Sequence, residues 1–188
     1  MKKVAVFGSG NGSNFQAIID YFKDLDIEFT AVSDKKDSFF LQRAKQNNIK
    51  NYFVPFEKTV DFLNKNDFDL IVLAGYMRIL SAQALADRKI INIHPSLLPE
   101  FKGTKSIERA YNSDNERTGV TVHYVNEEVD AGEIIAQRAV RIKKDMLLSE
   151  MEIKIHKIEH ILYPHVIEHL LFDTELCPDK LFCEGEIQ

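Results

Sequence analysis

Cysteine is scarce in this chain of 188 residues: there are two, at positions 177 and 183. Two cysteines do not make a disulfide framework, so we expect a reducing, cytoplasmic environment. No apolar run reaches the ~18 residues that a membrane span needs, and the early run that ends at Gly8 is too short for a signal peptide. Lys and Arg number 24 against 29 Asp and Glu, a net charge of −5, which argues against general nucleic-acid binding.

The first half of the chain alternates β-rich runs with helical patterns. Three runs, 28–33, 69–73 and 90–94, are almost continuously apolar, as is typical of parallel strands buried on both faces. The sequence therefore predicts the α/β class, with a doubly wound, mostly parallel, Rossmann-like sheet. The predicted strands are 3–7, 28–33, 51–54, 69–73 and 90–94, and the predicted helices are 14–22 and 39–47.

The second half predicts a strand pair, 119–125 and 133–142, joined by an acidic turn that contains a glycine. A long helix is predicted next, because apolar residues recur every three or four positions from Leu148 to Leu162. Pro164 is expected to kink or interrupt this helix. Residues after Phe172 lack a period and are predicted to form a tail.

The stretch Asn-Ile-His-Pro-Ser-Leu-Leu-Pro at 92–99 carries the strongest chemical signal. Strand alternation puts Asn92 and His94 on one face, and the prolines then impose a rigid turn. A histidine moves protons near neutral pH, and an amide can donate to a developing oxyanion, so this pair suits acyl-type chemistry. Asp130, in a later turn, could pair with His94 and support its charged form, or could be an ordinary solvated residue.

The glycine-rich segment 8–14 follows a predicted strand and opens a helix, the order found in phosphate-binding loops. Ser13 or Asn14 could cap the helix or bind a phosphate oxygen, and a plain tight turn is the alternative. The spacing is not that of a dinucleotide fingerprint, and the lysine of a P-loop is lacking. Asp34, at the end of the second strand, keeps a dinucleotide site open as a minor option.

Two further motifs each allow a structural and a functional interpretation. The segment 77–80 could line a slot for a flat aromatic ligand, or could anchor a loop in the core. The segment 156–160 matches the H-x-x-E-H pattern of a zinc-peptidase class, but no third ligand is clearly spaced, so we expect no metal. Glu159 could instead contact a ligand from a half-exposed helix. His123 could be a core residue or could point to the cleft.

Taken in order, these motifs resemble the phosphoribosylglycinamide formyltransferases, the folate-dependent transformylases of purine synthesis. The resemblance runs from residue 4 to about residue 167, and its landmarks are 10–14, 73–80, 92–99 and 129–132. It implies that the amine of glycinamide ribonucleotide attacks the formyl carbon of 10-formyltetrahydrofolate, a co-substrate, without a metal. It also implies small-molecule substrates. We expect no nucleic acid or membrane partner, and a monomer or homodimer.

The resemblance also assigns roles to residues. Asn92 and protonated His94 would stabilise the oxyanion, and Asp130 would support the imidazolium and help to relay a proton. The substrate-binding residues would be Gly12, Ser13 and Asn14 for the phosphate, and Glu159 with His156 for the ribose. The folate would be framed by Met77, Arg78, Ile79, Leu80, Asn92, Asn126, Glu127, Glu128, Val129 and Asp130.

The predicted organisation is a single formyltransferase domain over 1–188. Residues 1–100 would be the nucleotide- or phosphate-binding half, 101–172 the folate and catalytic half, and 173–188 the tail. The sequence departs from the family at His156, where a glutamine is frequent, and after Pro99, where a histidine is frequent. Three hypotheses compete with this one: a formyltetrahydrofolate hydrolase, a methionyl-tRNA formyltransferase and a non-catalytic nucleotide-binding module. The first two usually carry an additional domain, for which we expect no room here.

Overall fold

The computed structural model describes residues 1–176, and the chain divides into two compact units, 1–92 and 93–188. The boundary falls inside one strand, β5 (Ile90–His94). The single-domain organisation expected from the sequence stays a prediction.

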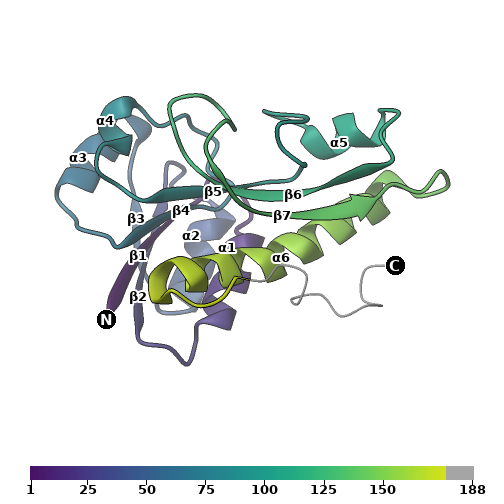
Figure 1. Cartoon of the computed structure of the whole chain (residues 1–188). Coiled ribbons are helices and arrows are strands. Elements are labelled where there is room, and N and C mark those ends of the chain that lie inside the picture. Colours follow the sequence, from purple (N-terminus) through teal and green to yellow (C-terminus); the bar gives the residue numbers. More distant parts are fainter. Residues whose placement is uncertain (177–188) are drawn as a thin grey trace. The chain divides into compact units, whose positions relative to one another are not determined.

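The first unit is built on a parallel sheet with the strand order β3-β2-β1-β4-β5 (Figure 1). The chain builds outward from β1 to β3 and then returns to add β4 and β5 on the other side, so the sheet is doubly wound, as predicted. Ligands of such sheets bind beyond the carboxyl ends of the strands, where the winding reverses. The other strand bounds are β1 (Lys2–Phe7), β2 (Ile27–Ser33), β3 (Lys50–Phe53) and β4 (Leu70–Leu73).

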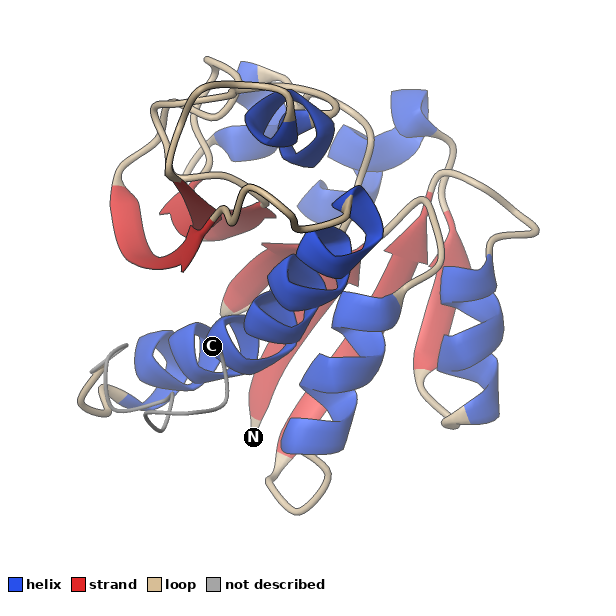
Figure 2. Cartoon of the chain, turned by 90° about the vertical axis from the view of Figure 1, so that its right-hand side faces the viewer, coloured by secondary structure: helices blue, strands red, loops and turns tan. Residues whose placement is uncertain are grey.

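Helices alternate with these strands along the chain (Figure 2). The two predicted helices are confirmed within one residue as α1 and α2, and α2 packs against β2 and β3. Ser38 caps α2, since its hydroxyl accepts the Leu41 N–H at 3.3 Å. The helices are α1 (Ser13–Tyr21), α2 (Phe39–Gln46), the 3-10 turn η1 (Phe56–Lys58), α3 (Thr59–Asn64) and α4 (Ala82–Leu85).

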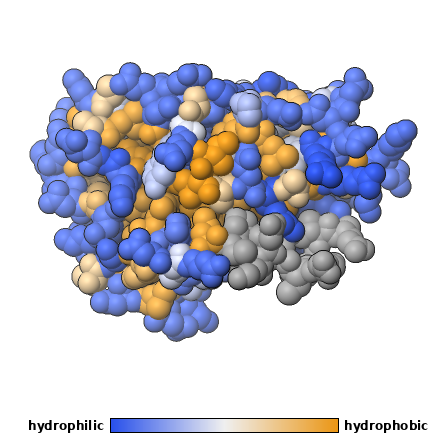
Figure 3. Space-filling view, in the orientation of Figure 1, coloured by the Kyte–Doolittle hydropathy of each residue, from blue (hydrophilic) through white to orange (hydrophobic). Residues whose placement is uncertain are grey.

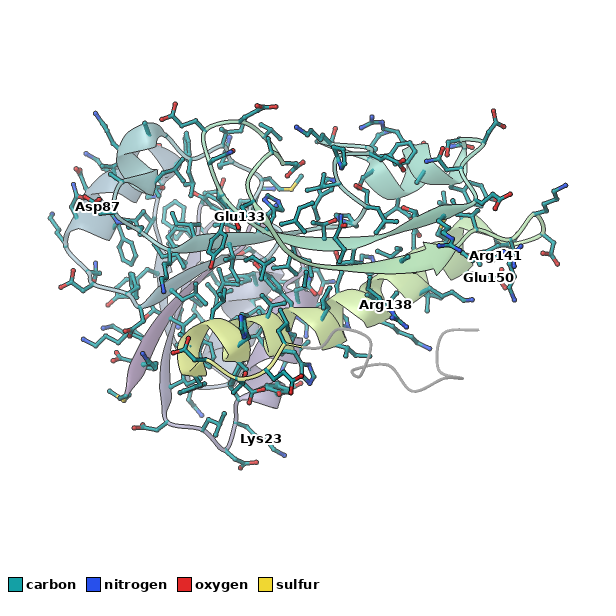
Figure 4. The ribbon with its side chains drawn as sticks, in the orientation of Figure 1. Lys23, Asp87, Glu133, Arg138, Arg141 and Glu150 are labelled. Carbon is teal, nitrogen blue, oxygen red and sulfur yellow. The ribbon has the colours of Figure 1, made fainter. Side chains whose placement is uncertain are left out.

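The second unit contains the predicted strand pair, which is antiparallel, and the predicted long helix. Strand β6 (Arg117–Tyr124) pairs with β7 (Ile134–Arg141), with an irregularity between Val122 and His123. Helix α6 (Leu148–Phe172) packs against both strands and against α5 (Ser106–Tyr111). Glu150, labelled in Figure 4, accepts the Leu147 N–H at 2.9 Å, which satisfies a backbone donor at the start of α6.

Pro164 does not interrupt α6, contrary to one of the two outcomes expected from the sequence. Proline lacks an N–H, so the carbonyl four residues earlier loses its helical partner, at a cost of about 3 kcal/mol in a helix interior. Tyr163, Val166 and Ile167, on either side, have no exposed surface. Burial of each large apolar side chain contributes about 1.5–3 kcal/mol, which offsets the proline and keeps the helix continuous.

Figure 3 shows exposed apolar residues among hydrophilic ones on the face that it draws. Among residues 1–176, no helix is both long and apolar enough to cross a membrane. Residues 173–176 follow α6 without helix or strand, and the rest of the predicted tail, with Cys177 and Cys183, lies outside the described residues.

The loop after β1 packs tightly against α2. A Cβ at Gly8 would lie 2.4 Å from the ring of Phe40, a side chain with no exposed surface. Gly10, two residues later, has no atom within 4 Å of the corresponding position.

We therefore expect Gly8→Ala to lower the free energy of unfolding by about 1–3 kcal/mol, the usual cost of overpacking a core. Urea unfolding measures this change through the transition midpoint. Gly10→Ala is the matched control and should shift the midpoint little. Equal losses in the two variants would contradict the packing explanation.

Candidate active site

The turn after His94 is held rigidly by two polar side chains of the strand pair. Thr121 Oγ1 donates to the Ser96 carbonyl at 2.6 Å and accepts the Leu98 N–H at 3.0 Å. Gln137 Nε2 donates to Thr121 Oγ1 at 2.8 Å and to the Leu98 carbonyl at 3.0 Å. The turn after His94 is therefore fixed by buried and partly buried hydrogen bonds as well as by its prolines.

His94 lies beside Asp130, far along the chain. The imidazole Nδ1 is 3.3 Å from Asp130 Oδ2, and both side chains are largely buried. The other ring nitrogen, Nε2, lies 3.0 Å from the Phe101 carbonyl oxygen. A carbonyl only accepts, so Nε2 is the donor in this contact. The ring therefore lies between two acceptors, the Phe101 carbonyl and the Asp130 carboxylate.

A second imidazole, from β6, contacts the same carboxylate. His123 is 2% exposed, and its Nε2 lies 3.6 Å from Asp130 Oδ1. Its Nδ1 donates to the Tyr124 carbonyl at 2.8 Å, which orients the ring. The sequence left His123 between a core role and a cleft role. The structure places it, buried, against Asp130, a contact for which the sequence carried no signal.

Asp130 is therefore a buried carboxylate surrounded by donors. The Gly103 N–H also donates to its Oδ2 at 2.8 Å. Burial raises the pKa of Asp130, but the hydrogen bond with His123, the Gly103 N–H and the charges of both imidazoles outweigh it. The net result is a pKa below the usual value of an aspartate, so this carboxylate is charged at neutral pH.

The turn that presents Asp130 depends on a close backbone approach. Asp130 itself has a φ of 50°, in the left-handed region. A Cβ at Gly132 would lie 1.6 Å from the Tyr124 carbonyl oxygen, so no larger residue fits there. This is the carbonyl that orients His123, which ties the glycine to the geometry of the carboxylate cluster.

Glu159 and His156 also meet, on α6. Glu159 is 4% exposed, and its Oε2 lies 2.8 Å from His156 Nδ1. That hydrogen bond raises the pKa of His156 above its ordinary value, against the smaller effect of burial. Among the described residues, no three His, Cys, Asp or Glu side chains are grouped so that they could hold a metal ion.

The segment 126–130 forms a tight polar turn that ends at Asp130. The Glu128 N–H donates to Asn126 Oδ1 at 3.1 Å, and Lys102 Nζ lies 3.1 Å from Glu128 Oε1. Val129 is exposed.

The glycine-rich loop of the first unit ends at the start of α1. The N-cap residue is Gly12, which has no side chain, and Ser13 and Asn14 are the first two residues of the helix. Arg43, from α2, donates to the Asn11 carbonyl at 2.9 Å and to Asn11 Oδ1 at 2.8 Å, which holds the loop in place. The loop thus keeps the arrangement of strand, glycines and helix N-terminus that suits an anion.

The end of β2 corrects the dinucleotide hypothesis. The carboxylate of Asp34 is 1% exposed, accepts from Ser9 Oγ at 2.6 Å, and accepts from Arg78 Nε at 2.7 Å. Both carboxylate oxygens are thus occupied by the protein, so Asp34 is not presented to a ribose.

In the segment 77–80, Met77 and Ile79 are exposed, while Leu80 is buried as a loop anchor.

Known proteins resemble this chain over nearly its whole length. Residues 2–167 match the formyl transferase family. The chain is 42% identical to phosphoribosylglycinamide formyltransferase of Bacillus subtilis, with 91% of this chain and 95% of that protein covered. It is 41% identical to the Haemophilus influenzae protein of the same name, with 89% and 86% covered. The crystal structure of the Bacillus halodurans protein of that name superposes with a TM-score of 0.85 at 38% identity, covering 93% and 97%.

The electrostatics of Asp130 predict a pH-dependent stability difference. Asp130→Asn should lower the free energy of unfolding at pH 7 by about 1–3 kcal/mol, because it weakens hydrogen bonds to a charged group. Since the folded-state pKa is lowered, the stabilisation is present above the unfolded pKa of about 3.9 and is lost as pH falls through the folded value.

Urea unfolding of both proteins between pH 7 and pH 3 measures this difference. The gap between wild type and variant should narrow as the pH falls below about 4. A gap that stays constant over this range would contradict the assignment of a charged, hydrogen-bonded carboxylate.

Proposed function

Because the chain belongs to the formyl transferase family, we propose that it transfers the formyl group of 10-formyltetrahydrofolate to the amine of glycinamide ribonucleotide. The product would be formylglycinamide ribonucleotide, an intermediate of purine synthesis. A cytoplasmic location and a monomeric or homodimeric state belong to the same proposal.

The observation that carries this proposal is the contact between His94 and Asp130. The two residues are 36 positions apart in the sequence, yet Nδ1 and Oδ2 are 3.3 Å apart in a buried setting. A charged carboxylate that stabilises an imidazolium is what acyl transfer needs, because negative charge develops on the formyl oxygen.

The proposed reaction proceeds through a tetrahedral intermediate. The amine nitrogen forms a bond to the formyl carbon, and the electron pair of the C=O bond moves onto the oxygen. His94 donates a hydrogen bond to that oxygen, together with the side-chain amide of Asn92. The intermediate collapses as the carbon–nitrogen bond to the folate breaks, and the proton lost by the amine passes to the leaving nitrogen with the help of Asp130.

The nitrogen of His94 that serves the substrate is assigned by elimination. Nδ1 faces Asp130, so Nε2 is the donor to the formyl oxygen. Its acceptor in this structure is the Phe101 carbonyl at 3.0 Å. The substrate oxygen therefore replaces a backbone acceptor, and the imidazolium exchanges one hydrogen bond for another that strengthens as charge develops.

The binding assignments follow the same proposal. Gly12, Ser13 and Asn14 hold the phosphate at the N-terminus of α1, where backbone N–H groups and the helix dipole favour an anion. Glu159, which is hydrogen-bonded to His156, accepts from the ribose hydroxyls. The pterin is framed by 77–80 and 126–130, with the exposed Met77 and Ile79 as apolar contacts.

The direct test is to incubate the protein with 10-formyltetrahydrofolate, with and without glycinamide ribonucleotide. Release of tetrahydrofolate only when the amine is present is the expected result. Release with water alone would overturn the proposal in favour of a hydrolase, and no release under either condition would favour a non-catalytic binding module.

The catalytic assignments predict large losses of rate in folded protein. His94→Ala and Asp130→Ala should each lower kcat by about 100-fold or more, the scale of one lost oxyanion-stabilising group. The matched controls are His169→Ala, at a half-buried position near the end of α6, and the exposed Asp114→Ala, and both should retain wild-type kcat. Asp130→Ala with full activity across neutral pH would contradict its assigned role.

The phosphate assignment predicts a different kinetic signature. Ser13→Ala should raise the KM for glycinamide ribonucleotide by about 5–20-fold, because one hydrogen bond to a charged oxygen is lost. The KM for 10-formyltetrahydrofolate and kcat should change little. A Ser13→Ala variant with an unaltered KM for the ribonucleotide would place the phosphate elsewhere.

A further inference from the structure

Asp34 is a buried charge that the proposed chemistry does not use. Its side chain is 1% exposed and lies at the carboxyl end of β2, the edge where ligands of a doubly wound sheet bind. One carboxylate oxygen accepts from Ser9, in the glycine-rich loop, and the other accepts from Arg78, in the segment 77–80. The two loops that follow β1 and β4 are thus joined through a residue that follows β2.

Ser9 extends this connection into a continuous chain of hydrogen bonds. Its hydroxyl proton goes to Asp34 Oδ1 at 2.6 Å, while its oxygen accepts the Met77 N–H at 3.1 Å. The Ser9 N–H donates to the Gly75 carbonyl at 3.0 Å. The glycine-rich loop and the segment 75–78 therefore contact each other through backbone and side-chain groups, with Asp34 at the centre.

The electrostatics show that the carboxylate of Asp34 is held in its charged form. Burial raises the pKa of Asp34. The hydrogen bonds from Ser9 and Arg78 and the charge of Arg78 together lower it by more than burial raises it, so the net pKa lies below the ordinary value. The Arg78 guanidinium also stacks 5.6 Å from the centre of the Phe56 ring, which restrains the side chain. Removing a partner of a buried charge strongly destabilises the folded protein, because the charge is then left without compensation.

We propose that Asp34 is a positioning residue that sets the glycine-rich loop and the segment 77–80 in their binding geometry together, so that its charge governs the affinity for both substrates. The inference rests on the proposed function, which assigns the phosphate to the first loop and the pterin to the second. Asp34 touches neither ligand. It acts through Ser9 on the one loop and through Arg78 and Met77 on the other.

The test is Asp34→Asn, a nearly isosteric change that removes the charge. Asn can still accept from Ser9, but its amide nitrogen meets the Arg78 donor, so the bond to Arg78 is lost. We expect the KM for both substrates to rise about tenfold, the scale of one charge-assisted hydrogen bond, while kcat stays within about twofold. Asp37→Asn, an exposed carboxylate three residues later, is the matched control and should leave both KM values unchanged.

Ser9→Ala tests whether the two residues act as one unit. Alone, it should also raise both KM values, because it removes the bonds to Asp34 and to Met77. The double variant should be no worse than the more impaired single variant, since residues in one network are non-additive. Effects that multiply in the double variant, or an Asp34→Asn variant that alters the KM of only one substrate, would overturn the proposal.

Amide hydrogen exchange separates this inference from the proposed function. Exchange in the segments 9–14 and 75–80 should accelerate in Asp34→Asn and not in Asp37→Asn, whether or not substrate is present. A wild-type protein that does not formylate the ribonucleotide would refute the proposed function, yet faster exchange in both segments would still support the coupling. Unchanged exchange in either segment would refute the coupling, even in a fully active enzyme.

Discussion

The chemistry of the second unit depends on the negatively charged carboxylate of Asp130 and on the donors that contact it. Two imidazoles and a backbone N–H converge on one carboxylate, and each contact is stronger while that carboxylate is ionised. The surrounding elements can be understood as support for this cluster. The β6–β7 pair pins the turn after His94, and the absence of a side chain at Gly132 allows the Tyr124 carbonyl to orient His123.

Much of the fold could be predicted because burial leaves a direct mark on composition. Strands with both faces covered are almost continuously apolar, so 69–73 and 90–94 were recognisable without any long-range information. The effect of Pro164 was harder to predict, since a local rule for proline competes with the burial of side chains that only the tertiary structure reveals. The short helices α3 and α4 have too few residues to develop a recognisable period.

The candidate site shows the same division between local and long-range information. Asn92 and His94 stand out because a strand, two polar residues and a proline occur in immediate succession. The residues left a pairing of His94 with Asp130 as one of two alternatives, and the family resemblance favoured it, because spacing alone cannot bring distant residues together. His123 and Asp34 carried no local signal for the contacts they make. Both are polar residues whose partners lie on other elements, so their contacts can be known only once the tertiary structure is known.

The group that faces His94 Nε2 belongs to the main chain. Every residue type at position 101 supplies the same peptide oxygen, so evolution cannot tune this contact by exchanging a side chain. Selection can act on it only through the path of the chain, for instance at the neighbouring left-handed positions 101, 103 and 105. The accessibility of the proton donor is thus encoded in backbone conformation, separately from the chemistry of the donor itself.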